Sequence, residues 1–153
     1  MIYNVSDVTL YILEKEHSLG WYISNLKLQK ILYFVQANFM VEKGEKCFYE
    51  PILAWSFGPV VPSVYRKYDV YGSSAIPYSK KYKRGDFLIL DRDKPLIDEM
   101  VEACLEYSAT DLVNITKNQT PWKNGYQEKG NREISPEGLK EYFEKKEIDR
   151  KKY

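Results

Sequence analysis

The chain has 153 residues, of which 44% are hydrophobic and 29% are charged, a balance typical of one globular domain with a buried core. Its 23 basic and 22 acidic residues leave a net charge of +1, which argues against long-range attraction to nucleic acid or to an anionic membrane. No stretch has the length and apolarity of a membrane span or a signal peptide, so we expect a cytoplasmic protein. The two cysteines, Cys47 and Cys104, are far apart and are expected to be free buried thiols.

Two helices are predicted in the first third of the chain. The first begins at Asn4 or Ser6 and ends near Gly20, and the second spans residues 25–41 and ends near Gly44. Two apolar stripes cover opposite faces of the second helix and leave only narrow polar flanks. The stripes consist of Leu28, Ile31, Leu32, Val35 and Phe39 on one face and Leu26, Tyr33, Ala37 and Met40 on the other. A helix that is apolar on two faces is typical of a buried central element.

The middle of the chain favours short extended segments around one further helix. Residues 47–57 are rich in aromatic residues and β-formers, and they predict a small hairpin or an edge strand. The Gly58-Pro59 pair is predicted to break the chain before a helix over residues 62–68 that begins with a proline. Residues 73–86 are predicted to form a loop, and residues 87–90 a short strand.

Three more helices are predicted in the C-terminal half. The first is capped by Asp91 or Asp93, and the second by Ser108 with Asp111 in a capping-box arrangement. A short turn is expected at residues 120–122, followed by a polar loop. The run Ser135-Pro136-Glu137 then starts the last helix.

The whole pattern predicts a mainly α fold, a compact multi-helix domain around the buried central helix with minor short β segments. We expect a single domain over residues 1–153, with a core at about residues 5–145 and a frayed tail at residues 146–153. No internal repeat or second domain is indicated.

Residues that catalysis or metal binding would need are scarce. His17 is the single histidine, and together with the two cysteines it supplies only three of the four ligands that a structural zinc site needs. There is no glycine-rich phosphate loop and no nucleophile elbow. We therefore predict no catalytic, metal or cofactor site. A hydrolase that uses two of the scattered carboxylates is an alternative, and it predicts an acidic cleft.

One basic run suggests a second alternative. The run Lys80-Lys81-Tyr82-Lys83-Arg84 interleaves cations with an aromatic residue, as single-strand nucleic-acid binders do. On a near-neutral chain, a solvated charged loop is the favoured interpretation. A nucleic-acid-binding or regulatory role through this loop is the alternative.

Several separated segments resemble, in order, the SocA-like antitoxin domain known as Panacea, which also occurs in phage-associated proteins of the GepA type. They are the run Leu28-Gln29-Lys30-Ile31-Leu32-Tyr33-Phe34, residues 54–65, Tyr71-Gly72, Thr116, Pro121-Trp122 and residues 134–137. One position departs from the family, because Lys117 stands where many members have a histidine. This departure weighs against a histidine-dependent activity and leaves a packing role intact.

The resemblance implies an antitoxin that neutralises its toxin by direct protein–protein binding, and the partner is expected to be encoded alongside it. For one branch of the family it also implies a proteolytic adaptor that delivers the toxin to the ClpXP protease. Fourteen tyrosines fit either a protein-binding surface, where tyrosine is enriched, or half-buried edges of the core. The candidate partner-binding residues are Trp55, Tyr65, Tyr68, Tyr71 and Trp122.

Overall fold

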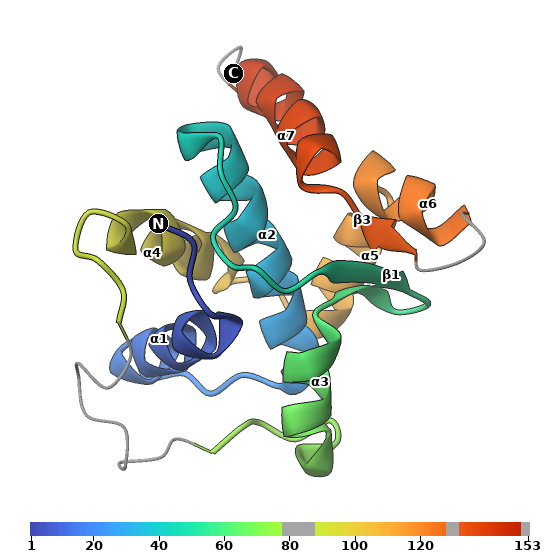
Figure 1. Ribbon diagram of the computed structural model, residues 1–153. Helices are drawn as coiled ribbons and strands as arrows, with labels where there is room; N and C mark the ends of the chain where they lie inside the picture. Colours follow the sequence, from blue (N-terminus) through green and yellow to red (C-terminus); the bar gives the residue numbers. More distant parts are fainter. Residues whose placement is uncertain (78–87, 128–131, 151–153) are drawn as a thin grey trace.

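The computed structural model describes most of the chain, namely residues 1–77, 88–127 and 132–150, with side chains as far as residue 146 (Figure 1). The basic run at residues 80–84, on which the nucleic-acid alternative depends, lies outside these ranges. Most of the loop predicted at residues 73–86 also lies outside them. None of the helices in the described ranges is both long enough and apolar enough to cross a membrane.

The fold begins with two helices at the predicted places, α1 (Val5–Ser18) and α2 (Asn25–Lys43). The Asn4 side chain accepts a hydrogen bond from the Ser6 N–H and so caps α1. Gly44, in the left-handed conformation with φ 69°, ends α2. Both ends follow from local chemistry that is visible in the sequence.

A small antiparallel sheet follows, with strands β1 (Ile52–Trp55), β2 (Gly58–Val60) and β3 (Glu133–Ile134) in the order β2-β1-β3. Strands β1 and β2 form the predicted hairpin, but the chain break predicted at Gly58-Pro59 is wrong, because both residues belong to β2. A proline fits there for two reasons. Strand β2 is an edge strand, and the N–H of Ala54, which faces Pro59, donates to Arg132 O on the other side.

After the hairpin come α3 (Pro62–Tyr68) and the short 3₁₀ helix η1 (Asp69–Tyr71). The predicted helix start at Pro62 is confirmed, with the proline in the first turn. The strand predicted at residues 87–90 is wrong for its described part, since residues 88–90 pair with no strand. The N–H of Leu90 donates instead to the Tyr3 hydroxyl at 3.1 Å.

The described residues of the C-terminal half include the helices α4 (Lys94–Cys104), α5 (Ala109–Lys117), α6 (Thr120–Gln127) and α7 (Pro136–Arg150). The capping box of Ser108 and Asp111 is confirmed in both directions. The turn predicted at residues 120–122 is wrong, because these residues begin α6. A proline suits the first turn of a helix as well as it suits a β-turn. The Pro121 signal, at the second position of α6, therefore does not distinguish the start of a helix from an isolated turn.

Helix α2 lies in the middle of the molecule, in contact with α3, α4, α5, α7 and β2 (Figure 1). The prediction of a mainly α fold around a buried central helix, with a minor β component, is confirmed. The polar flanks of α2 are buried as well, at Gln29, Lys30 and Gln36. They bond to other segments, as when Gln29 Oε1 accepts the N–H of Val61 at 2.9 Å. Both cysteines are buried and free, as expected.

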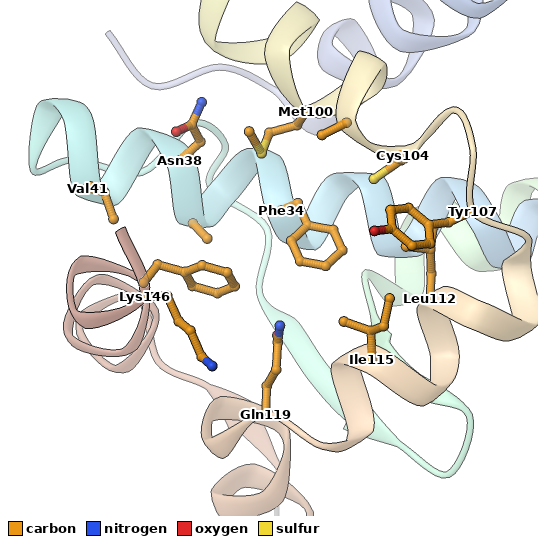
Figure 2. A pocket seen from close by; sticks show the side chains of 13 residues that line it. Phe34, Asn38, Val41, Met100, Cys104, Tyr107, Leu112, Ile115, Gln119 and Lys146 are labelled. Atoms are coloured by element: carbon orange, nitrogen blue, oxygen red, sulfur yellow. The ribbon is translucent and has the colours of Figure 1, made fainter. Parts of the chain in front are cut away.

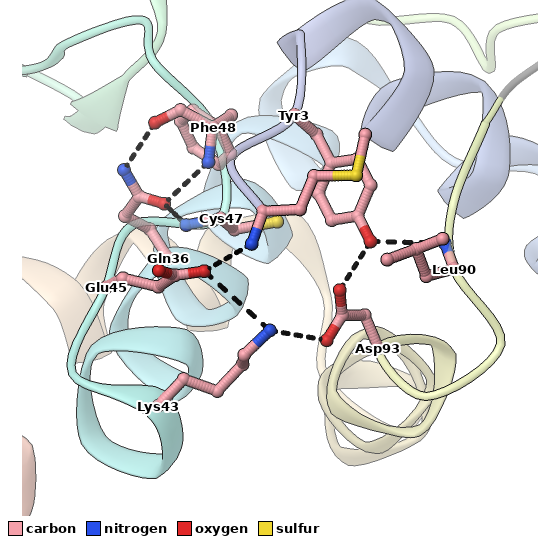
Figure 3. Close-up of polar contacts among 9 residues, drawn as sticks. Tyr3, Gln36, Lys43, Glu45, Cys47, Phe48, Leu90 and Asp93 are labelled. Carbon is pink, nitrogen blue, oxygen red and sulfur yellow. Dashed lines mark hydrogen bonds and ion pairs between the residues drawn. The ribbon is translucent and has the colours of Figure 1, made fainter.

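A polar network joins the N-terminal segment to α2 and α4 (Figure 3). Asp93 occupies the N-cap position of α4, but its side chain does not cap the helix. It accepts hydrogen bonds from the Tyr3 hydroxyl and from Lys43 Nζ, the latter at 2.7 Å. Burial raises the pKa of Asp93, yet the bonds from Lys43 and Tyr3 outweigh it and the net shift is downward. The carboxylate therefore stabilises the fold in its ionised form.

Replacing Asp93 by alanine is expected to lower the free energy of unfolding by about 2 kcal/mol at pH 7, because the Tyr3 hydroxyl and Lys43 lose a charged partner. Urea unfolding measures the change. Asp91→Ala is the matched control, since Asp91 is 94% exposed and forms its ion pair with the neighbouring Lys94, whereas Asp93 is 1% exposed. The contribution of Asp93 to the free energy of unfolding should be complete above about pH 4, and it should be lost as the pH falls through the lowered pKa of Asp93. Equal costs for the two variants would contradict this role.

Candidate functional site

Three aromatic side chains meet where the β1–β2 hairpin lies against α3. They are Trp55 at the end of β1, Phe57 in the turn and Tyr65 on α3, and we call them the aromatic triad. Their ring centroids lie 5.8 Å apart for Trp55 and Phe57, 5.4 Å for Trp55 and Tyr65, and 5.5 Å for Phe57 and Tyr65. All three are half-buried. The structure thus brings together two residues predicted from the sequence and adds Phe57.

The other three predicted residues lie in different surroundings. Tyr68 and Trp122 are largely buried, with exposed fractions of 7% and 8%, whereas Tyr71 on η1 is 39% exposed. Trp122 supports the triad from within, because its Nε1–H donates to the main-chain oxygen of Trp55 at 2.8 Å. Lys117 lies with its Nζ 5.3 Å from the centroid of the Trp122 ring.

A fully buried lysine lies behind the triad. Lys30 reaches from α2 toward the hairpin, where its Nζ donates to Pro59 O at 3.0 Å and lies 5.6 Å from the centroid of Phe57. None of the ion pairs in the described part of the chain involves Lys30. Burial lowers the pKa of Lys30 from 10.5 to about 7, because the charged form loses its hydration. The ammonium group is thus held at the hairpin with one carbonyl oxygen as its acceptor.

Gly58 closes the contact between Lys30 and the hairpin. Its φ of +107° is a conformation that residues with a side chain rarely adopt. A Cβ atom there would lie 2.6 Å from Lys30 Cε and 3.2 Å from Thr116 Oγ1. Thr116 is itself fixed, since Oγ1 donates to Leu112 O at 2.8 Å. Three segments that are far apart in the sequence therefore meet at one position, which we call the Lys30–Gly58–Thr116 contact.

Sequence reasoning did not assign Lys30 a role, because helical periodicity placed it on a polar flank of α2. One signal could have found it. Lys30, Gly58 and Thr116 all fall within the segments that carry the family resemblance, although they come from α2, β2 and α5. Of the three, Gly58 carries the clearest signal, because a glycine in a short extended segment often marks a place where another part of the chain approaches closely.

Replacing Lys30 by methionine is expected to raise the free energy of unfolding by about 2 kcal/mol at pH 7, because the apolar side chain fills the same space without a buried charge. The size of this difference depends on pH. Unfolded lysine keeps its proton to about pH 10 but folded Lys30 loses it near pH 7, so wild-type stability rises between these values. Urea unfolding should show the gap between variant and wild type narrowing by about 2 kcal/mol from pH 7 to pH 9. A gap that does not change with pH would contradict the buried charge.

In the described part of the chain, no group of three or more histidine, cysteine, aspartate or glutamate side chains is placed to hold a metal ion. The site described above consists instead of aromatic surface on a rigid support. Such an arrangement suits recognition of another macromolecule, because fixed aromatic rings bury a large area and lose little freedom when they do so.

Comparison with known proteins gives one family. Residues 28–123, well over half of the chain, match the model of the family described as "Antitoxin SocA-like, Panacea domain". The matched range contains the aromatic triad, the Lys30–Gly58–Thr116 contact and Trp122. The chain is also similar to Antitoxin SocA of Caulobacter vibrioides (strain NA1000 / CB15N), with 45% identity over 65 residues. That alignment spans 42% of this chain and 35% of the relative, about a third of the relative's length. No solved structure gives a significant match.

Proposed function

Because the chain belongs to the SocA-like Panacea domain family, we propose that it is a cytoplasmic antitoxin that neutralises a toxin protein by binding it directly. The family match over residues 28–123 is the observation that carries the proposal. The shape of the candidate site supports it, since the site offers aromatic contact surface and a preformed scaffold. The proposed role is not enzymatic.

We place the toxin contact at the aromatic triad. Half-buried Trp and Tyr side chains are the commonest source of binding energy in protein interfaces. Here the rings are already held by one another, by the Lys30–Gly58–Thr116 contact and by the Trp122 bond to Trp55 O. Binding would therefore cost little additional ordering of side chains. In this proposal Tyr71, which is 39% exposed on η1, is a further contact residue, and the largely buried Trp122 positions the triad through its bond to Trp55 O.

Two modes of neutralisation are open to an antitoxin that binds directly. The chain could cover the active surface of the toxin, or it could act as a proteolytic adaptor that hands the bound toxin to ClpXP, as the family resemblance implies for one branch. The first mode needs a stable complex and no protease. The second needs the protease, so toxin levels should fall only in cells that contain ClpX.

Co-expression in a bacterial host tests the proposal. The gene product encoded next to this chain is induced alone and together with the chain, in hosts with and without ClpX. Growth should be arrested by the neighbouring product alone and restored when the chain is present. Rescue in both hosts supports covering of the toxin, and rescue only with ClpX supports the adaptor role. If the chain restores growth in neither host, the proposed antitoxin function for this pair is wrong.

A further inference from the structure

A cavity of about 290 Å³ opens between α2, α4, α5 and α7, and no residue of the aromatic triad lines it (Figure 2). At about 30 Å³ for each water-sized group, this volume holds roughly ten non-hydrogen atoms. The walls are mainly apolar and come from all four helices, with Phe34, Met100, Leu112, Ile115 and Phe143 among them. A mainly apolar cavity of this size, with a few polar groups at its edge, is typical of a small-molecule site.

Two of the polar side chains that line the cavity can donate hydrogen bonds into it. Figure 2 shows the amide nitrogen of Gln119 turned into the cavity, with Lys146 and the ring of Tyr107 at its edge. The amide oxygen of Gln119 is occupied, because it accepts a hydrogen bond from the Tyr33 hydroxyl at 2.7 Å. Gln119 therefore offers its Nε2–H groups and Lys146 offers a cation.

Acceptors are few around the same cavity. Asn38 is turned toward α4, where its amide nitrogen donates to Leu96 O at 2.9 Å. None of the side chains that line the cavity in the described part of the chain is a carboxylate. The charge and the hydrogen-bonding groups at this edge thus favour an anion with acceptor oxygens over a cation or a hydrocarbon.

We propose that the cavity binds a small apolar carboxylate of about the size of octanoate. The hydrocarbon chain lies among the apolar walls of α2, α4, α5 and α7. The carboxylate accepts hydrogen bonds from Gln119 Nε2 and is neutralised by Lys146 Nζ. This inference does not depend on the antitoxin proposal, because the cavity and the aromatic triad share no residue.

Titration with octanoate tests the proposal on the intact chain, followed by methyl NMR signals of Met100 and Ile115. Octanoate should shift both signals in a saturable way and bind about tenfold more tightly than 1-octanol, while octylamine should bind more weakly than either. Lys146→Met should weaken octanoate about fivefold, as expected for a partly exposed charge pair, and leave 1-octanol unchanged. Equal binding of octanoate and 1-octanol would overturn the carboxylate assignment.

A matched pair of variants tests the location. Ala103 lines the cavity from an exposed position on α4, so Ala103→Phe should fill the cavity, leave the fold intact and abolish octanoate binding. Asn114→Phe adds the same ring at an exposed position on α5 that does not line the cavity, and it should bind octanoate normally. Unchanged binding by Ala103→Phe would overturn the proposal. The proposal would also be overturned if octanoate failed to bind and Ala103→Phe no longer neutralised the toxin. The cavity would then be a contact site for the toxin protein.

Discussion

Replacing Gly58 by alanine is expected to lower the free energy of unfolding by about 4 kcal/mol, the largest stability effect that we expect from a single methyl group in this chain. Two costs add. An alanine at φ +107° is strained by about 1–3 kcal/mol. The new Cβ would also overlap Lys30 Cε at 2.6 Å, and overpacking in a closed site costs about 1–3 kcal/mol. Urea unfolding at pH 7 measures the loss.

Gly20→Ala is the control for the backbone cost alone. Gly20 also has a positive φ, +83°, but a Cβ there would meet no atom within 4 Å. We expect this variant to cost about 1 kcal/mol. If Gly58→Ala costs no more than Gly20→Ala, then the hairpin is not fixed by close packing against Lys30 and Thr116. The Lys30–Gly58–Thr116 contact would then not hold the aromatic triad in place.

The aromatic triad should dominate binding to the toxin. The double variant Trp55→Ala/Tyr65→Ala is expected to weaken the complex about 100-fold, because truncating central aromatic residues of an interface commonly costs 2 kcal/mol or more. The bond from Trp122 goes to the main-chain oxygen of Trp55, so it is retained in the variant. Isothermal titration calorimetry with the purified toxin measures the change.

Tyr49→Ala is the matched control for this binding experiment. Tyr49 is 63% exposed, and it is not part of the triad. The control should bind the toxin as tightly as the wild type does. A thermal unfolding curve for each variant shows whether it is folded at the temperature of the titration. Equal affinities for the folded double variant, the control and the wild type would place the toxin contact elsewhere.

Local chemistry accounts for the part of the fold that the sequence predicts. The caps at Asn4 and Ser108, the proline start at Pro62 and the apolar stripes of α2 depend on residues within a few positions of one another. Because such signals involve only neighbouring residues, they can be recognised without knowing the folded structure. The wrong predictions concern prolines and short apolar runs, whose role depends on what lies opposite. Pro59 is accommodated in β2 because this is an edge strand and because Ala54, which faces it, bonds to Arg132 on the other side, so that no N–H is needed from Pro59.

The buried polar residues show why the remaining contacts of the fold could not be predicted from the sequence. Lys30 and Glu16 look like surface residues at helix flanks, but both are buried, and burial raises the pKa of Glu16 as it lowers that of Lys30. Asp93 has the sequence context of a helix cap and bonds instead to Tyr3 and Lys43. These outcomes depend on contacts between distant segments, about which periodicity and capping rules carry no information.

The candidate site was partly visible in the sequence. Trp55 and Tyr65 were singled out by residue type within the family-like segments, and the fold places their rings together. Tyr68 lies one helical turn after Tyr65 on α3 and has the same residue type, yet its side chain is buried in the core. Neither the Lys30–Gly58–Thr116 contact nor the cavity beside Gln119 follows from any one segment. Each needs at least three elements to be placed in space.

Direct binding is tested by mixing the purified chain with the purified product of the neighbouring gene, the proposed toxin, and measuring the mass of the product by size-exclusion chromatography with light scattering. We expect a complex of the two proteins that forms without any protease and that the Trp55→Ala/Tyr65→Ala variant fails to form at the same concentration. A toxin that the chain neutralises in cells but does not bind when both are pure would contradict direct binding as the mechanism.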